Sequence, residues 1–71
     1  MESNGLIAVF NATRNEMHEF ESTMQVQNYL RDVSKEDSVY VLQNYAFVDT
    51  AEELVGWAHD DFIADGWEVL Q

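Results

Sequence analysis

The chain contains no proline and only three glycines among its 71 residues. Because these two residues are the strongest local interruptions of helices and strands, regular elements with short connections should dominate the chain. Hydrophobic residues make up 46% of it and aromatic residues 13%, which is enough for a core and is untypical of a disordered acidic tail. We therefore expect residues 1–71 to form one small acidic domain.

The hydrophobic pattern predicts a sheet that begins with a hairpin. The apolar run LIAVF, residues 6–10, is typical of a strand, NATRNE interrupts it, and MHEF, residues 17–20, returns as a second strand. The segment SVYVLQNYAFV, residues 38–48, is rich in β-branched and aromatic residues. It predicts one long strand, or two short strands divided at Gln43–Asn44. WEVL, residues 67–70, predicts a final strand.

Two helices are predicted between these strands. The first occupies residues 22–33, where Ser22 is the expected N-cap and Gln25 completes a capping box. The second begins at Asp49 or Thr50, with Glu53 as the partner of Thr50 in another capping box, and continues until Gly66 stops it. The resulting order, β-β-α-β-α-β, predicts an α+β fold with a small single-layer sheet and two helices.

The charge is divided unevenly along the chain. The net charge is −11, and residues 36–71 contribute −9 of it, because they carry nine acids and no lysine or arginine. Residues 1–35 carry five acids and three bases. We therefore expect one strongly negative region on the surface, which disfavours direct binding to nucleic acid or to anionic lipid because like charges repel.

The predicted second helix directs several of these acids to solvent. On a helical wheel its core-facing stripe consists of Ala51, Leu54, Val55, Ala58 and Phe62. Glu53 and Asp60 fall opposite that stripe and Glu52 lies on its flank, whereas Asp61 and Asp65 approach a helix end where negative charge is unfavourable. A partly exposed tryptophan beside carboxylates would be a suitable binding anchor. The candidate partner-binding residues are Glu36, Asp37, Glu52, Glu53, Asp60, Asp61, Asp65 and Trp67.

Patterns that indicate catalysis or metal binding are weak. The chain has no cysteine, and it contains neither a G-x-S-x-G elbow nor a glycine-rich phosphate loop. Imidazole and carboxylate groups are neighbours only in Glu16-x-His18 and in His59-Asp60-Asp61. A metal site would need these two segments to meet. We expect no enzyme, no catalytic residue, no cofactor and no metal.

Several interpretations of the acidity stay open. The acids can be a solvated surface that keeps the protein soluble, or an adaptation to high salt. They can also imitate nucleic-acid phosphates and occupy a basic groove on another protein. The alternative from a different class is a small structural or interaction protein, including a homodimer that pairs an exposed sheet edge.

Size, composition and charge together resemble those of small acidic proteins encoded by phages and mobile elements. That class includes anti-CRISPR proteins, anti-restriction proteins and uracil-DNA glycosylase inhibitors. The resemblance implies an inhibitor of a basic nucleic-acid-binding protein in the cytoplasm of a bacterial or archaeal host, and it transfers no individual binding residue. The N-terminus MESNGLIAVF lacks the basic start of a signal peptide, and no stretch approaches the ~18 apolar residues of a membrane span. We therefore expect no membrane partner.

Overall fold

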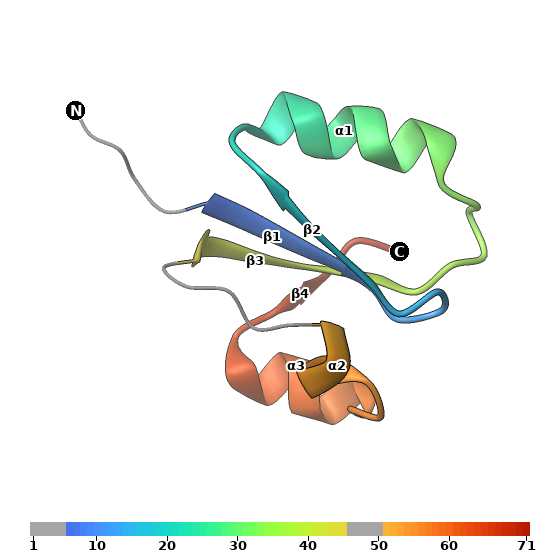
Figure 1. The fold of residues 1–71 in the computed structure, drawn as a ribbon, viewed down its shortest axis with the longest axis vertical. Helices are drawn as coiled ribbons and strands as arrows, with labels where there is room; N and C mark the ends of the chain where they lie inside the picture. The colour runs from blue at the N-terminus through green and yellow to red at the C-terminus, as the bar shows by residue number, and fades with distance from the viewer. Residues whose placement is uncertain (1–5, 46–50) are drawn as a thin grey trace.

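The structure is a computed structural model that describes residues 6–45 and 51–71. Its elements, in chain order, are β1 (Leu6–Asn11), β2 (Glu16–Phe20), α1 (Thr23–Asp32), β3 (Val39–Tyr45), α2 (Ala51–Leu54), α3 (His59–Asp65) and β4 (Glu68–Val69). The strands form one antiparallel sheet in the order β2-β1-β3-β4 (Figure 1). The predicted α+β class is confirmed.

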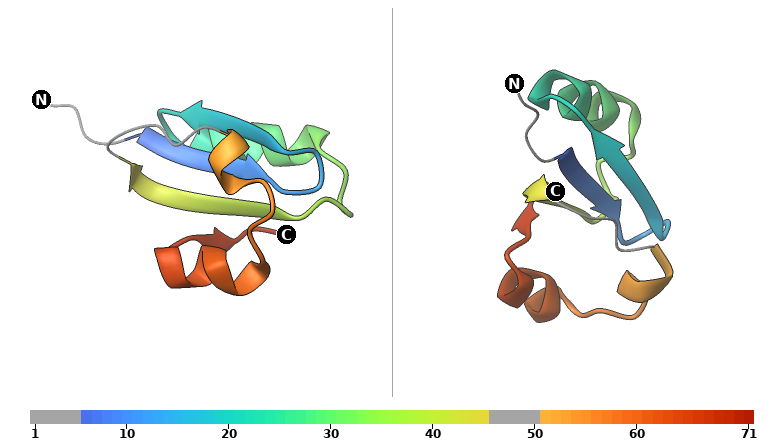
Figure 2. Two further views of the ribbon diagram at one scale, coloured as in Figure 1. Left: turned by 60° about the horizontal axis from the view of Figure 1, so that its bottom comes forward. Right: turned by 60° about the vertical axis from the view of Figure 1, so that its left-hand side comes forward.

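Helices cover both faces of this sheet. Figure 1 and Figure 2 show α1 on one side of the strands and the α2–α3 pair on the other. Side chains alternate along β1, so Ala8 and Phe10 belong to one core cluster while Val9 belongs to the other. The cluster on the α2–α3 side consists of Ala8, Phe10, Tyr40, Leu54, Phe62 and Trp67. The cluster on the α1 side consists of Val9, Val26, Val39 and Val41.

The hairpin is confirmed, with Asn11 opposite Glu16 at its closed end. Asn15 supplies the left-handed conformation in the turn, with φ 59°, which asparagine tolerates better than most residues. β3 continues through Gln43 without a division, so the alternative of two short strands is wrong up to residue 45. The predicted remainder of that strand, residues 46–48, lies outside the described residues.

The first helix begins where its sequence predicts. The Ser22 hydroxyl accepts a hydrogen bond from the backbone N–H of Gln25 at 3.3 Å. The Gln25 side chain accepts in return from the backbone N–H of Glu21 at 2.7 Å, one residue earlier than a standard capping box requires. Val26 is buried against the sheet.

The prediction of one long second helix is wrong. α2 ends at Leu54, Gly56 adopts φ 93°, and α3 starts at His59. A continuous helix would separate Leu54 from Phe62 by about 12 Å along its axis, whereas the break lets both side chains enter the same cluster. Val55, expected in the core, is 51% exposed. The predicted capping box at Thr50 lies outside the described residues. Gly66 ends α3, as predicted, and has φ 102°.

Candidate functional site

The α2–α3 layer carries acidic side chains and no basic ones. Its exposed acids are Glu52, Glu53, Asp60, Asp61 and Asp65. The three bases of the chain are elsewhere: Arg14 lies in the β1–β2 turn, Arg31 in α1, and Lys35 in the loop after α1. The uneven charge along the chain therefore becomes an uneven charge between the two helical layers.

A hollow on α3 brings two of these acids together with an aromatic ring. Trp57, Asp61, Ala64 and Asp65 line a space of about 410 Å³. Trp57 is half-buried, and its ring packs against that of Phe62 at 5.2 Å between centroids. Asp61 and Asp65 are one helical turn apart, so their side chains lie on the same side of α3. A carboxylate pair and an aromatic side chain thus line one open depression of the surface.

Hydrogen bonds orient both carboxylates. An Asp61 oxygen accepts from the backbone N–H of Ala58 at 2.9 Å, which caps the start of α3. An Asp65 oxygen accepts from the indole N–H of Trp67 at 3.0 Å. Each of these bonds uses one oxygen of its carboxylate, and both aspartates remain exposed. Their positions are therefore set before any partner arrives.

The prediction that Trp67 lies on the surface is wrong. Trp67 is 2% exposed and meets the ring of Phe62 edge-on, with centroids 5.8 Å apart. The reason is the left-handed turn at Gly66, which reverses the chain toward β4 and places the indole in the core. Trp57 is the tryptophan beside the acids instead. It lies in the connection between α2 and α3, outside both helices.

Asp37 also differs from its predicted place on the surface, because it is 5% exposed. One of its oxygens accepts from the side-chain amide of Asn11 at 2.9 Å and from Arg14 Nε at 2.8 Å. These two hydrogen bonds, that of Asn11 above all, lower the pKa of the Asp37 carboxyl below its ordinary value. The Asn11 amide also donates to the hydroxyl of Tyr29 at 3.2 Å. Asp37 therefore connects the loop that leads into β3 with the β1–β2 hairpin.

Glu36 is exposed but lies apart from the acids of α3. It belongs to the loop between α1 and β3, where its backbone N–H donates to the Ser34 hydroxyl at 3.2 Å. Of the acids predicted on the second helix, the structure brings Asp61 and Asp65 together in one hollow, whereas Glu52 and Glu53 lie on α2. Glu36 and Asp37 do not join this acidic surface.

The two histidines lie against opposite core clusters. His59 Nδ1 is 3.1 Å from the hydroxyl of Tyr40, on the α2–α3 side. His18 packs against Phe20 and Tyr29 on the α1 side. The two segments that a metal site would require are therefore separated by the sheet.

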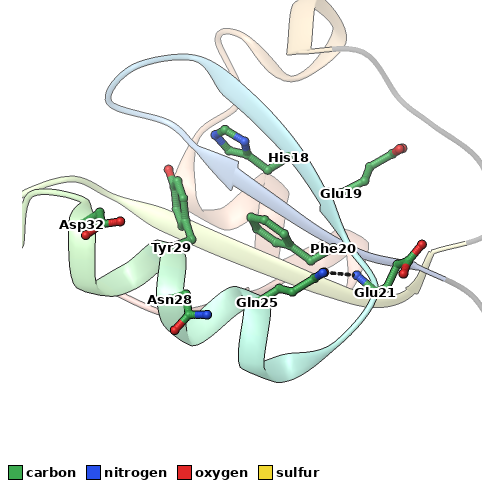
Figure 3. Close-up of a pocket in the computed structure, with 8 residues that line it drawn as sticks. All are labelled: His18, Glu19, Phe20, Glu21, Gln25, Asn28, Tyr29 and Asp32. Atoms are coloured by element: carbon green, nitrogen blue, oxygen red, sulfur yellow. Dashed lines mark hydrogen bonds between the residues drawn. The ribbon is translucent and has the colours of Figure 1, made fainter.

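A second hollow lies between β2 and α1 (Figure 3). It measures about 630 Å³, and its lining residues are His18, Glu19, Phe20, Glu21, Gln25, Asn28, Tyr29 and Asp32. None of these residues is among the candidate partner-binding residues predicted from the sequence, although His18 belongs to the Glu16-x-His18 pair that was considered for a metal site. The available signal was the presence of three acids among the six residues 16–21, which include a predicted strand, and this indicates a strand with a charged edge.

No protein-family model matches the chain, and no curated protein or solved structure is significantly similar to it. Within residues 6–45 and 51–71, no helix is both long and apolar enough to cross a membrane. The function must therefore be inferred from the geometry and the charge of the molecule itself.

Proposed function

We propose that this protein is a non-enzymatic inhibitor that presents the α2–α3 layer to the basic surface of a nucleic-acid-binding protein. A CRISPR effector, a restriction enzyme or a similar protein would be the target. The observation that carries the proposal is the hollow in which Trp57 lies beside Asp61 and Asp65, on a layer that has five exposed acids and no base.

The chemistry of this hollow matches that of a nucleotide in three respects. Carboxylates form charge-assisted hydrogen bonds with arginine and lysine, as phosphates do. Their negative field steers a basic partner and accelerates association. The half-buried ring of Trp57 offers an apolar face where a nucleobase would otherwise stack, and such aromatic residues dominate interface energetics.

The position of Asp65 favours binding over solubility as the reason for these acids. Asp60 and Asp61 lie in the first turn of α3, where the helix dipole stabilises negative charge, so both have a local explanation. Asp65 lies in the last turn, where the same dipole disfavours it, and it follows Asp61 by four residues, a spacing at which like charges repel. An asparagine at that position could accept the hydrogen bond from the Trp67 indole without this unfavourable charge, so the hydrogen bond alone does not explain a carboxylate there.

A pull-down with a matched pair of charge reversals tests the proposal. The tagged protein is incubated with a bacterial lysate at about 50 mM salt, eluted at about 200 mM, and the eluate is identified by mass spectrometry, because phosphate-like contacts weaken steeply over this range. Asp60→Lys changes the α2–α3 layer, and Glu36→Lys makes the same charge change in an exposed loop outside it.

We expect one nucleic-acid-binding protein to be retained, to be released by salt, and to be displaced by DNA or RNA. Asp60→Lys should weaken the purified complex by about tenfold or more, and Glu36→Lys by less than about threefold, since rim charges contribute little to affinity. Equal effects of the two reversals would contradict the proposal, because the contact would then depend on net charge and not on the α2–α3 layer.

The alternative, a homodimer or structural protein whose acids serve solubility, predicts the opposite response to salt. An apolar interface holds or tightens as salt rises, whereas a contact between charged surfaces weakens. Sedimentation of the purified protein across the same salt range separates the two.

A further inference from the structure

The outer edge of β2 has the geometry of a docking site for another strand. β2 is an end strand of the sheet, in the order β2-β1-β3-β4. In the part of the chain that the structure describes, its pairing is with β1 alone. An end strand presents N–H and C=O groups that can pair with a further chain. Which groups these are follows from the hydrogen bonds on the other side of the hairpin.

Alternation along β1 assigns Met17 and Glu19 to that outer edge. The backbone N–H of Ala12 donates to the carbonyl of Ser38 at 2.8 Å, so the even-numbered residues of β1 direct their backbone groups toward β3. The odd-numbered residues then face β2, where their partners are Glu16, His18 and Phe20. The residues between those partners, Met17 and Glu19, direct their N–H and C=O groups outward.

Aromatic rings form the floor of the hollow beside this edge. The ring centroid of His18 lies 4.7 Å from that of Tyr29, and Phe20 lies 5.8 Å from Tyr29 (Figure 3). The Nε2 atom of His18 is buried and has no hydrogen-bond partner among the described residues, the Glu16 carboxylate being 3.6 Å away. A ligand in the hollow would thus meet ring faces.

Carboxylates line the same hollow. Glu21 and Asp32 are exposed there, and Glu16 lines an adjoining space beyond Tyr29. Glu19 borders the hollow, but its side chain lies on the other face of the sheet, because it is opposite Ala8 in the strand pair. The one base in that adjoining space, Arg14, is bound through its Nε to Asp37 at 2.8 Å. The surface around the edge of β2 therefore combines negative charge with ring faces, which is the combination that attracts a lysine or arginine side chain.

We propose that β2 accepts an extended basic segment of a partner protein as a fifth strand of the sheet. Backbone groups of the segment pair with Met17 and Glu19, which supplies affinity that does not depend on sequence. Because side chains alternate along a strand, every second residue of the segment faces α1. A lysine or arginine at those positions lies over the rings of the hollow and within reach of Glu21 and Asp32. This surface lies on the α1 side of the sheet, so the proposal does not depend on the function assigned to the α2–α3 layer.

Charge disfavours a second copy of this chain as the occupant. Two β2 strands side by side would bring Glu16, Glu19 and Glu21 of both copies into one ribbon, between chains that each carry a net charge of −11. Like charges opposite each other destabilise a strand pair. The acids that prevent self-pairing are the same acids that select a basic partner.

A fluorescein-labelled peptide of about eight residues, alternating lysine and threonine, is the probe, and its length matches that of a typical strand. The control peptide replaces each lysine with glutamate. Two neutral variants are compared, Glu19→Pro and Glu19→Thr. Both remove the carboxylate, but only proline removes the outward N–H, and neither disturbs the bonds between β1 and β2.

We expect the lysine peptide to bind the natural protein and the glutamate peptide not to bind. Glu19→Pro should bind the lysine peptide about tenfold more weakly than Glu19→Thr, because it lacks one main-chain hydrogen bond of the added strand. Amide chemical shifts of the natural protein should move most at Met17 and Glu19. These shift changes are measured on the natural protein, so they test the proposal even if the Glu19→Pro variant does not fold.

Three results would overturn the proposal. Equal binding by the two variants would show that the edge N–H is not used. Shift changes confined to α2 and α3 would place the peptide on the acidic layer. A dimer of the natural protein that Glu19→Pro dissociates would show that the edge pairs with a second copy.

Discussion

The carboxylate of Asp65 accepts a hydrogen bond from the indole N–H of Trp67 at 3.0 Å. The bond joins an exposed residue in the last turn of α3 to the most voluminous fully buried side chain of the described core. It gives the indole nitrogen an acceptor without bringing a charge into the core. It also holds the Asp65 carboxylate at the rim of the hollow that Trp57 lines.

Replacement of Asp65 by asparagine or by alanine should separate the charge of this residue from its hydrogen bond. Asparagine keeps an acceptor for the indole and removes the negative charge at the end of α3, so we expect stability to rise by about 0.3–1 kcal/mol. Alanine also removes the charge but leaves the indole nitrogen without its acceptor, so it should be less stable than asparagine by about 1 kcal/mol. Urea unfolding of both variants measures the difference. Equal stabilities would mean that the bond contributes nothing.

The two tryptophans should differ in accessibility. In Trp67→Phe the remaining indole is the half-buried Trp57, and in Trp57→Phe it is the buried Trp67. Acrylamide is a neutral quencher that the negative surface does not repel, so it should quench the first variant more strongly than the second. The result would be reversed if Trp67 were on the surface.

The same two positions should differ in stability when each is truncated to alanine. Trp67→Ala removes a large side chain from the core and should cost about 3–5 kcal/mol, a large part of the stability of a small domain. Trp57→Ala removes a half-buried ring and should cost about 1 kcal/mol. Thermal unfolding followed by circular dichroism checks both. A small effect at Trp67 would contradict its placement in the core.

Gly56→Ala tests the break between α2 and α3. A Cβ at this position would meet no atom within 4 Å, but the backbone has φ 93°, a conformation that alanine adopts only with strain. We expect a loss of about 1 kcal/mol. If residues 50–65 instead formed one helix, the same substitution would stabilise it by about 1 kcal/mol. The sign of the change in urea unfolding therefore distinguishes the two structures.

Asp37→Asn should change how stability depends on pH. The folded-state pKa of Asp37 is lowered from its ordinary value of 3.8, by the hydrogen bonds from Asn11 and from Arg14. Its contribution is therefore fully present above that ordinary value and is lost as the pH falls through the lower folded-state pKa. Relative to the natural protein, Asp37→Asn should be less stable at neutral pH, and the gap should narrow below about pH 4. Melting temperatures measured at matched ionic strength from neutral to acidic pH would show this, and a constant gap would contradict it.

Short-range patterns in the sequence were sufficient for most of the elements. The apolar run of residues 6–10, its interruption and the return at residues 17–20 predicted the hairpin, and Ser22 predicted the start of α1, because short strands and helix caps depend on neighbouring residues. The absence of bases after Lys35 likewise placed the negative charge on the α2–α3 layer. These features need no knowledge of what packs against them.

Tertiary packing decided the rest. Leu54 and Phe62 fit one helical stripe, yet they enter the cluster with Trp67 from two helices that are separated at Gly56. Asp37 has the chemistry of a surface residue, but Asn11 and Arg14 are 26 and 23 residues distant in the chain and meet it only after folding. The sequence by itself determined the hairpin, the first helix, the third strand and where charge accumulates, because those properties are local. Which tryptophan is exposed, which acid is buried and which strand edge stays open depended on contacts between distant segments, which no local pattern specifies.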